Sequence, residues 1–309
     1  MNEIKIFSPA TVANVACGFD VLGFCLNELG DDMIVRKTQE KGLKINHIEG
    51  FPLPLEVHKN VAGVSALALY EHATPNCGFE IEIYKRIKPG SGVGSSAASA
   101  AGSVYAINEL LGTPYDKTQL TEFAMKGEAL ASSCEHADNI APCIFGGFTL
   151  VKSNNPLMVL QLPTPSNLYA TIIHPQIEIK TSEARKLLPI DIPLSKASQQ
   201  WANLGGLIHA LHTNDYKLMQ ACLEDVIIEP FRKQCIPYFD DAKTAAIANG
   251  ALGCAISGSG PAIFALSKSL ETAKRVERAL EAVYSSTTIA FHTYVSSISH
   301  QGIKTLKQR

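Results

Sequence analysis

The sequence predicts an α+β fold built from two domains, and three observations support this prediction. Residues 1–90 show the short patterns of strands, and residues 97–132 have the composition of helices. From residue 169 onward, strand-like and helix-like segments mix without the strict βαβ order of a parallel sheet. The length of 309 residues also suggests two domains, or one large one.

The N-terminal part, residues 1–90, is expected to consist of strands. Residues 4–7, 43–46 and 80–84 follow a period of two, and residues 33–35 form a short apolar run. Side chains that alternate in this way lie on a sheet with one exposed face. We therefore expect an antiparallel or mixed sheet.

Two helices follow this sheet. Residues 97–111 are rich in alanine and contain no proline, and Gly112-Thr113-Pro114 ends the segment. A second helix is expected at residues 117–132, with Asp116 as its N-cap.

The second of these helices carries a carboxylate in an apolar stripe. Leu120, Ala124 and Glu128 are spaced by four residues and therefore share one face. Glu128 either reaches solvent at the end of the helix or points inward to a site. The helical pattern alone favours neither alternative.

The domain junction is expected where prolines and asparagines cluster, at Asn154, Asn155, Pro156, Pro163 and Pro165. This predicts domains of residues 1–160 and 161–309. In the second domain we expect strands at 169–174, 262–266 and 289–295, and helices at 198–213, 216–227, 240–248 and 270–283. The last of these strands is a candidate to return to the N-terminal domain.

Composition excludes several classes of protein. The net charge of −2 gives no basic field for the phosphate backbone of nucleic acid. The eight cysteines show no CxxC spacing, which argues against zinc fingers and favours buried thiols in a reducing compartment. Residues 1–9 lack the apolar core of a signal peptide, and no apolar run is long enough to span a membrane. We therefore expect a cytoplasmic protein.

The strongest local signal is a glycine-rich loop at residues 90–98, Gly-Ser-Gly-Val-Gly-Ser-Ser-Ala-Ala, directly before the first helix. Glycines let the backbone approach a ligand, and the helix start offers free N–H groups, so the loop suits a phosphate. Of Ser95 and Ser96, one hydroxyl could bond an oxygen of the ligand and the other could bind Mg²⁺. A second glycine-rich segment, residues 255–262, fits a ligand held between domains.

Other kinds of nucleotide-binding loop, and a purely structural role, compete as interpretations of this segment. Neither the Walker A string nor the protein-kinase strings HRD and DFG are present. Residues 92–97 match the dinucleotide pattern GxGxxA, but the alternating strand before them and the second helix after them do not suit a Rossmann unit. The loop could also serve close helix packing and bind nothing.

Three motifs resemble the GHMP kinase superfamily, named for galacto-, homoserine, mevalonate and phosphomevalonate kinases. They are residues 9–14 (Pro-Ala-Thr-Val-Ala-Asn), residues 92–98 and residues 257–261 (Ser-Gly-Ser-Gly-Pro). Val93 stands where the family usually has leucine, and Pro89 is one place late, with Lys88 at the usual position. The resemblance implies an N-terminal domain like domain 2 of ribosomal protein S5, a ferredoxin-like C-terminal domain, and ATP between them.

Within the superfamily, the chain is most similar to the homoserine kinase family. The similar segments are residues 14–23, residues 136–139 with Pro142 and Phe145-Gly-Gly147, and residues 181–189. This resemblance implies transfer of the ATP γ-phosphate to the side-chain hydroxyl of L-homoserine, a step toward threonine. It also implies Mg²⁺ as cofactor and a homodimer, while composition argues against a nucleic-acid or membrane partner.

The resemblance also assigns roles to residues. Substrate binding falls to Asn14, Asp20, His136, Asn139, Arg185 and Arg232, and catalysis to Asn139, Thr181 and Asp20. ATP binding falls to Asn60, Lys88, Pro89, Gly90, Ser91, Gly92, Val93, Gly94, Ser95, Ser96, Ala97, Ala98, Ser259 and Gly260. The implied metal ligands are Ser96 and Glu128, which gives an inward Glu128 a purpose.

The assigned chemistry suits an amino-acid substrate. An arginine can bind a carboxylate with two hydrogen bonds, and Asp20 can pair with an ammonium. Asn139 stands where mevalonate-kinase-like members carry a basic aspartate, and an amide cannot act as a general base. Asp138 is adjacent, but we expect its side chain to point elsewhere. Positioning and electrostatics are then expected to carry phosphoryl transfer, with the proton lost late.

Three rival functions remain. The first is a GHMP kinase for another alcohol, such as mevalonate, although mevalonate has no ammonium for Asp20. The others are a nucleotide-binding regulator without turnover and an NAD-dependent oxidoreductase. Ser96 with Glu128 argues against the regulator, and the missing βαβ units argue against the oxidoreductase.

Overall fold

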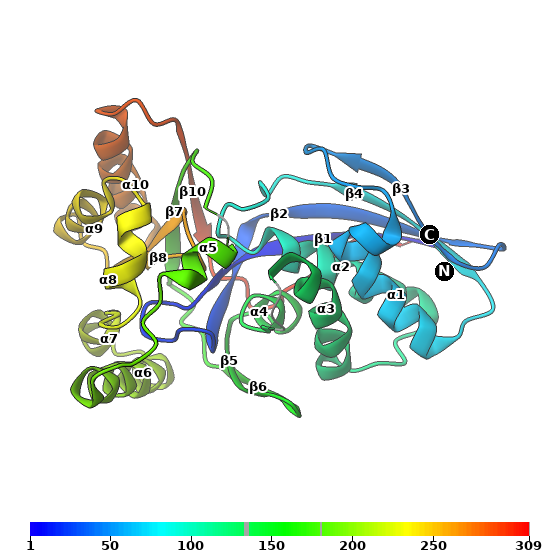
Figure 1. Ribbon diagram of the computed structural model, residues 1–309, viewed down its shortest axis with the longest axis horizontal. Helices are drawn as coiled ribbons and strands as arrows, with labels where there is room; N and C mark the ends of the chain where they lie inside the picture. Colours follow the sequence, from blue (N-terminus) through cyan, green and yellow to red (C-terminus); the bar gives the residue numbers. More distant parts are fainter. Residues whose placement is uncertain (133–135, 180, 309) are drawn as a thin grey trace.

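The computed structural model describes residues 1–132, 136–179 and 181–308. Within these residues the chain forms a seven-stranded sheet and a four-stranded sheet, which lie side by side (Figure 1). The strands of the larger sheet are β1 (Glu3–Ala13), β2 (Leu22–Thr38), β3 (Leu43–Glu49), β4 (Gly78–Tyr84), β5 (Phe148–Asn154), β6 (Leu157–Leu162) and β11 (Lys304–Gln308).

The larger sheet is mixed, as the alternating patterns predict. Its order is β11-β1-β2-β4-β3, and β5 and β6 continue it from the other end of β2. Only the β3–β4 pairing is parallel among the described strands. The long strand β2 pairs with β4 through residues 32–38 and with β5 through residues 22–24, so it links both parts of the sheet.

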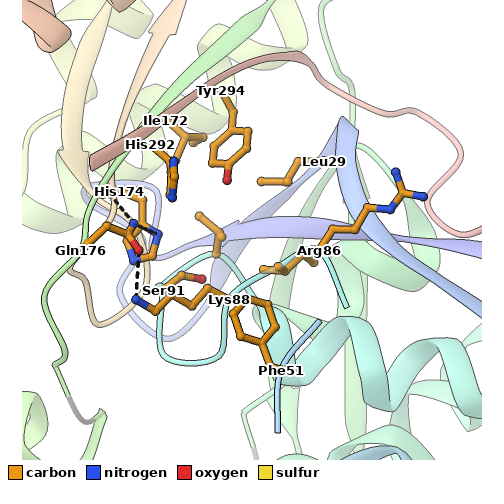
Figure 2. Close-up of a pocket in the computed structure, with 12 residues that line it drawn as sticks. Leu29, Phe51, Arg86, Lys88, Ser91, Ile172, His174, Gln176, His292 and Tyr294 are labelled. Atoms are coloured by element: carbon orange, nitrogen blue, oxygen red, sulfur yellow. Dashed lines mark hydrogen bonds between the residues drawn. The ribbon is translucent and has the colours of Figure 1, made fainter. Parts of the chain in front are cut away.

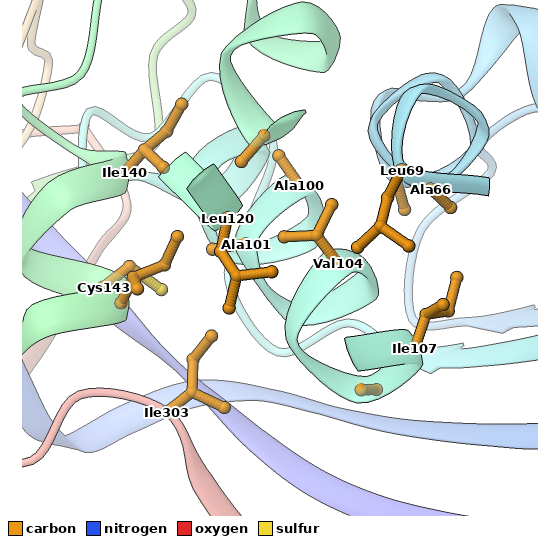
Figure 3. Packing of buried hydrophobic residues seen from close by; sticks show 14 of the residues in the cluster. Ala66, Leu69, Ala100, Ala101, Val104, Ile107, Leu120, Ile140, Cys143 and Ile303 are labelled. Atoms are coloured by element: carbon orange, nitrogen blue, oxygen red, sulfur yellow. The ribbon is translucent and has the colours of Figure 1, made fainter. Parts of the chain in front are cut away.

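Four helices cover one face of the larger sheet (Figure 1). They are α1 (Val61–Ala73), preceded by the short η1 (Val57–Lys59), α2 (Ser95–Leu111), α3 (Lys117–Ser132) and α4 (Ile140–Phe145). Leu69, Val104, Ile107 and Leu120 gather between α1, α2 and α3 in the core (Figure 3). The predicted helix at 117–132 is confirmed, and Asp116 Oδ1 accepts the Gln119 N–H at 2.9 Å as its cap.

The expectation that residues 1–90 are all strands is wrong at α1. Asn60 starts this helix, because its Oδ1 accepts the Ala62 N–H at 2.9 Å. The helix is buried on more than one side, and small residues bring it close to its neighbours. A Cβ at Gly127 of α3 would lie 2.1 Å from Ser65 Oγ of α1. A helix packed in this way has no single apolar stripe, so its period is hard to see in the sequence.

The second sheet forms the core of the C-terminal half. Its strands β7 (Tyr169–Pro175), β8 (Gly253–Ile256), β9 (Ile263–Ser267) and β10 (Phe291–Ser297) have the order β10-β7-β9-β8. The helices here are α5 (Thr181–Lys186), α6 (Leu194–Thr213), α7 (Tyr216–Cys222), α8 (Glu229–Arg232), η2 (Lys233–Cys235), α9 (Phe239–Ala248) and α10 (Leu270–Ser285). Together, α9 and α10 pack against this sheet (Figure 1), and the chain is α+β as predicted.

The chain returns to the first sheet through a different strand from the expected one. The strand expected at 289–295 is β10, which pairs with β7 and stays in the second sheet. It is β11 that returns, by pairing with β1, and the two termini therefore lie close together (Figure 1). The sequence pattern at 304–308 was too short and polar to suggest a strand.

The proline–asparagine cluster serves two different turns. Asn155 and Pro156 form the turn of the β5–β6 hairpin within the first sheet, whereas Pro163 and Pro165 lie between β6 and β7. The division at residue 160 remains a prediction.

The helix expected at 216–227 ends at Cys222, because the Asp225 carboxylate accepts the N–H groups of residues 227–229 and starts another turn. None of the described helices has the length and hydropathy of a membrane span.

Candidate active site

The two glycine-rich loops lie against each other between the sheets. Ser257 Oγ donates to the Gly92 carbonyl at 2.7 Å, and the Ala262 N–H donates to the Ser91 carbonyl at 3.1 Å. A Cβ at Gly92 would lie 2.7 Å from the Ser257 carbonyl oxygen and 2.8 Å from that of Gly260. Glycine is therefore needed at position 92 so that segments from the two halves of the chain can meet.

The first loop ends at Gly94, directly before α2. Gly94 has a φ of 67°, and a Cβ there would lie 2.1 Å from Thr11 Oγ1. The position therefore requires glycine for both conformation and space. With the loop held in this way, the unpaired N–H groups at the start of α2 form a site for an anion such as a phosphate.

A cavity of about 480 Å³ opens at this point. It is wide enough for a cofactor-sized ligand. Both glycine-rich loops line it, together with residues from η1, α1, α3 and the start of α4. Among the predicted site residues, the cavity brings together Asn60, Pro89, Gly90, Ser91, Gly92, Gly94, Ser95, Ser96, Glu128, Asn139 and Ser259.

A buried ion pair holds the end of the first glycine-rich loop in place. Lys85 and Asp31, each with a side chain 1% exposed, form a salt bridge. Lys85 Nζ also donates to the Ser95 carbonyl at 2.9 Å and to Ser99 Oγ at 3.0 Å, and Asp31 Oδ1 accepts the N–H groups of residues 86 and 87. The pair therefore ties β2, the end of β4 and the first turn of α2 together. Sequence reasoning missed it, because its two residues are far apart in the chain.

Glu128 points inward from α3 to the cavity, where it hydrogen-bonds with Ser96. Burial raises the pKa of Glu128 from 4.5 to about 7, with a further rise from the charge of Asp138, although the Ser96 hydrogen bond opposes both. A carboxylate and a hydroxyl beside a phosphate-binding loop are oxygen ligands of the kind that Mg²⁺ prefers. Among the described residues there is no group of three His, Cys, Asp or Glu that could hold a metal ion.

Asn139 faces the same cavity from the turn before α4. Its Oδ1 accepts a hydrogen bond from Thr11 Oγ1 at 2.8 Å, which leaves the Asn139 amide nitrogen as the group that can donate to a ligand. Thr11 lies within the first motif, but its role was not predicted. The Thr11 N–H also donates to the Val93 carbonyl at 3.2 Å, so Thr11 links the glycine-rich loop to Asn139.

A charged cluster adjoins the cavity through residues 136–139 and Gly258. Arg185 Nη2 lies 3.0 and 3.1 Å from the two carboxylate oxygens of Asp20, and 3.0 Å from His136 Nε2. Because a guanidinium can only donate, His136 Nε2 accepts this bond and the imidazole is neutral, with its proton on Nδ1. Burial lowers the pKa of His136, Arg185 lowers it further, and Asp20 opposes both effects.

Arg232 completes this cluster from α8. It is buried, its Nη1 donates to the Gly258 carbonyl at 3.0 Å, and burial lowers its pKa. Both Arg185 and Arg232 lie over the ring of Phe19, with guanidinium carbons 5.7 and 5.0 Å from its centre. Phe19 was missed, although it lies next to the predicted Asp20.

Asn14 links this cluster to the second glycine-rich loop. Its Nδ2 donates to the Gly258 carbonyl at 2.7 Å, and its Oδ1 accepts the Asp20 N–H at 2.9 Å. Both ends of the Asn14 amide are thus held by the protein. Asn14 and Asp20 have φ values of 71° and 58°, in the left-handed region that asparagine and aspartate tolerate best after glycine.

Asp138 is closer to the site than expected. It is buried, and burial followed by the charge of Asp20 raises its pKa from 3.8 to about 7. Hydrogen bonds from its own N–H and that of Asn139 oppose this rise, as does the charge of Arg185. The Asp138 carboxyl thus caps the turn of residues 138–139, which lies between the cavity and the charged cluster. Asp138 does not line the cavity itself.

Some predicted residues lie outside the cavity or have their polar atoms bonded within the protein. The polar atoms of Asn60 both bond the protein, since Nδ2 donates to the Pro54 carbonyl at 2.8 Å and Oδ1 caps α1. Lys88 and Val93 line a neighbouring cavity (Figure 2). Ala97 and Ala98 are buried beneath the loop, and Gly260 packs on Gly92. Thr181 begins α5, but its side chain lies outside the described part of the chain.

Comparison with protein families agrees with the motifs. The family of GHMP kinases N-terminal domains matches residues 59–147, and the family of GHMP kinases C-terminal domains matches residues 207–286. The homoserine kinase of Chlorobium phaeobacteroides strain BS1 is 43% identical, over 99% of this chain and 100% of its own. That of Xanthomonas campestris pv. campestris strain B100 is 36% identical, over 99% and 95%.

Comparison with solved structures gives the same result. The crystal structure of homoserine kinase from Cytophaga hutchinsonii matches with a TM-score of 0.95 and 49% identity, over 99% of this chain and 98% of that one. The L. major mevalonate kinase in complex with R-mevalonate matches with a TM-score of 0.72 at 14% identity, over 95% and 96%, and shares the fold. The protein therefore belongs to the homoserine kinase family of the GHMP kinases.

Proposed function

We propose that this protein transfers the γ-phosphate of ATP to the side-chain hydroxyl of L-homoserine, giving O-phospho-L-homoserine and ADP for threonine synthesis. One observation carries the proposal: a cavity walled by two glycine-rich loops adjoins a cluster that holds one carboxylate and two guanidiniums. The cavity suits a nucleotide triphosphate, and the cluster suits a zwitterion.

The cluster recognises the amino-acid end of the substrate. The ammonium group pairs with Asp20, and the carboxylate pairs with Arg185 and Arg232. Arg185 and Asp20 form a salt bridge with each other, and each carries the charge opposite to that of one end of the substrate. Binding exchanges this internal pair for two pairs with homoserine. His136, as a neutral imidazole beside Arg185, keeps the guanidinium oriented.

The phosphates of ATP bind at the first glycine-rich loop and the start of α2. The Asn139 amide, held by Thr11, orients the attacking hydroxyl or the γ-phosphate. Ser96 and Glu128 would hold Mg²⁺, which neutralises charge on the phosphates when it is bound. A cation beside the Glu128 carboxyl would favour its ionised form and so oppose the rise in its pKa that burial causes.

No step requires a strong base. Asp138 has a pKa near that of a useful base, but it is hydrogen-bonded to the N–H groups of its own turn and lies outside the cavity wall. A loose transition state needs little deprotonation of the alcohol beforehand. Asp20, Asn139 and Thr181 therefore act by position and charge, and the proton leaves late.

Further parts of the proposal concern the assembly and its compartment. We infer that the two domains divide near residue 160, at the end of the β5–β6 hairpin, with β11 belonging to the first domain. The cysteines that the structure describes are free and mostly buried, which supports a reducing compartment such as the cytoplasm. A homodimer is proposed on family resemblance alone, and sedimentation would test it.

Release of ADP from Mg-ATP tests the activity, with L-homoserine, L-threonine, L-serine, mevalonate or no acceptor. The proposal predicts strong stimulation by L-homoserine alone. Stimulation by mevalonate would refute the proposed substrate site but keep the kinase. No stimulation by any acceptor, with ATP still bound, would favour a regulator without turnover.

A further inference from the structure

A second cavity of about 230 Å³ lies beside the nucleotide cavity and shares Ser91 with it (Figure 2). It opens between the segment leading into the first glycine-rich loop and strands β7 and β10 of the other sheet. Its polar lining residues are Arg86, Lys88, Ser91, His174, Gln176, His292 and Tyr294, and its apolar ones are Leu29, Phe51, Ile87, Val93 and Ile172. The proposed kinase chemistry uses none of the groups on β7 and β10.

Gln176 fixes the protonation of His174. Lys88 Nζ donates to Gln176 Oε1 at 2.9 Å, so the amide nitrogen of Gln176 must face the other way. That nitrogen lies 3.1 Å from His174 Nδ1, which therefore accepts its hydrogen bond (Figure 2). The neutral imidazole then carries its proton on Nε2. Burial, with smaller effects from Lys88 and His292, lowers the pKa of His174 to about 4 and keeps the ring neutral.

The cavity therefore offers hydrogen-bond donors in excess of acceptors. His174 Nε2 and Ser91 Oγ are buried and have no hydrogen-bond partner within the described chain. The hydroxyl of Tyr294 points toward the same space in Figure 2. His292 lies directly across from His174 in the β7–β10 pairing. A ligand that accepts several hydrogen bonds would satisfy these groups together.

Charge in the cavity has the same sign throughout. Lys88 is a cation, and its Nζ bonds a neutral amide. No Asp or Glu is among the twelve lining residues, all of which the structure describes. Arg86 has its counterion outside, since its Nη2 bonds Asp32 at 3.3 Å and its guanidinium points away from the histidines (Figure 2). The charge of Lys88 thus lacks an anion inside the cavity.

We propose that this cavity binds a small oxyanion, a carboxylate or phosphate group on a small metabolite. Lys88, His174, Ser91, Tyr294 and His292 are its ligands. The cavity is smaller than the roughly 300–1,000 Å³ typical of drug-sized ligands, so a whole nucleotide does not fit. The site is distinct from that of ATP, and the two are separated by the loop that carries Ser91.

Histidine side-chain NMR tests the site. The protein is first saturated with ADP, so that the nucleotide loop is filled, and is then titrated at constant ionic strength with inorganic phosphate or with acetate. Saturable shifts of the His174 and His292 rings are expected, with a dissociation constant of about 10 mM or less. Shifts with phosphate alone identify a phosphate group, and shifts with acetate alone identify a carboxylate.

Two variants and a control make the test specific. Tyr294→Phe and His292→Gln each remove one ligand, and each should weaken the binding about tenfold, the usual effect of losing one hydrogen bond to a charged group. His209→Gln, at an exposed position on α6, should leave it unchanged. Absence of saturable shifts with both anions, or equal affinity in all the variants, would overturn the proposal.

Discussion

Glu128 is expected to serve metal binding in the active site and, at the same time, to lower the free energy of unfolding of the protein. The Glu128 carboxyl is partly buried, and burial raises its pKa from 4.5 to about 7. Ionising a group in such surroundings costs folding free energy, because the unfolded chain ionises it more easily. Glu128→Gln keeps the size and the hydrogen bond to Ser96 but removes the charge. We therefore expect a protein that is more stable and inactive.

The magnitude follows from the two pKa values. A pKa that rises on folding gives stability that is present below the unfolded value and is lost as pH increases through the folded value. For 4.5 and about 7, the loss is about 3 kcal/mol at about pH 8 and about 1 kcal/mol at about pH 5. Glu128→Gln should recover up to these amounts. The gain should therefore grow as the pH rises, which a simple packing change would not produce.

Urea denaturation in EDTA measures this gain at both pH values. Glu122→Gln is the matched control, since Glu122 is exposed on the same helix, and it should change neither stability nor activity. The reasoning would be refuted if Glu128→Gln lowered the free energy of unfolding at pH 8, or gave the same gain at both pH values. Retention of Mg-dependent activity would refute the role of Glu128 as a metal ligand.

Three further predictions concern the loop and the substrate cluster. Gly94→Ala should lower the free energy of unfolding by about 2 kcal/mol or more and raise the KM for ATP, because the new Cβ, at a φ of 67°, meets Thr11 Oγ1. The control Gly112→Ala, at a φ of 88° in open space, should lower the free energy of unfolding by only about 1 kcal/mol and leave activity unchanged. Equal effects of the two in urea and in kinetics would contradict this. Lys85→Met leaves the Asp31 carboxylate buried without its cation, so the free energy of unfolding measured in urea should fall by about 3–5 kcal/mol. A fall of less than about 1 kcal/mol would be inconsistent with the ion pair. Arg185→Ala should raise the KM for homoserine about 10- to 100-fold and leave the KM for ATP unchanged. Arg185→Lys should restore only part of the affinity for homoserine, since lysine cannot bind a carboxylate with two parallel hydrogen bonds. An unchanged KM for homoserine in Arg185→Ala would show that Arg185 does not bind the substrate.

Local signals in the sequence predicted much of the fold. The helices predicted at 97–111 and 117–132 were found from alanine content, the cap at Asp116 and the Gly112-Thr113-Pro114 segment, and the structure places them at Ser95–Leu111 and Lys117–Ser132. The helix α1 was missed because it is packed on several sides and shows no apolar stripe. The return of β11 to β1 was also missed, because it depends on a pairing between the two ends of the chain.

The candidate site divides in a similar way. The glycine-rich loops, Ser96, Glu128 and Asn139 were named from motifs, and they line one cavity. Contacts between distant segments gave no sequence signal, as with Lys85 on Asp31 and Thr11 on Asn139. The second cavity was not predicted either, since Lys88 meets His174 and Gln176 only after the two sheets pack. Motifs thus reveal residues that touch a ligand, whereas the residues that position them emerge from tertiary packing.

The most direct test of the account is the identity of the product, measured by ³¹P NMR after the protein is incubated with Mg-ATP and L-homoserine labelled with ¹³C at the carbon that bears the hydroxyl. The account predicts one new phosphomonoester signal, coupled to that carbon, which appears as ATP is converted to ADP. Formation of inorganic phosphate alone, or of a phosphate that is not coupled to the labelled carbon, would contradict it.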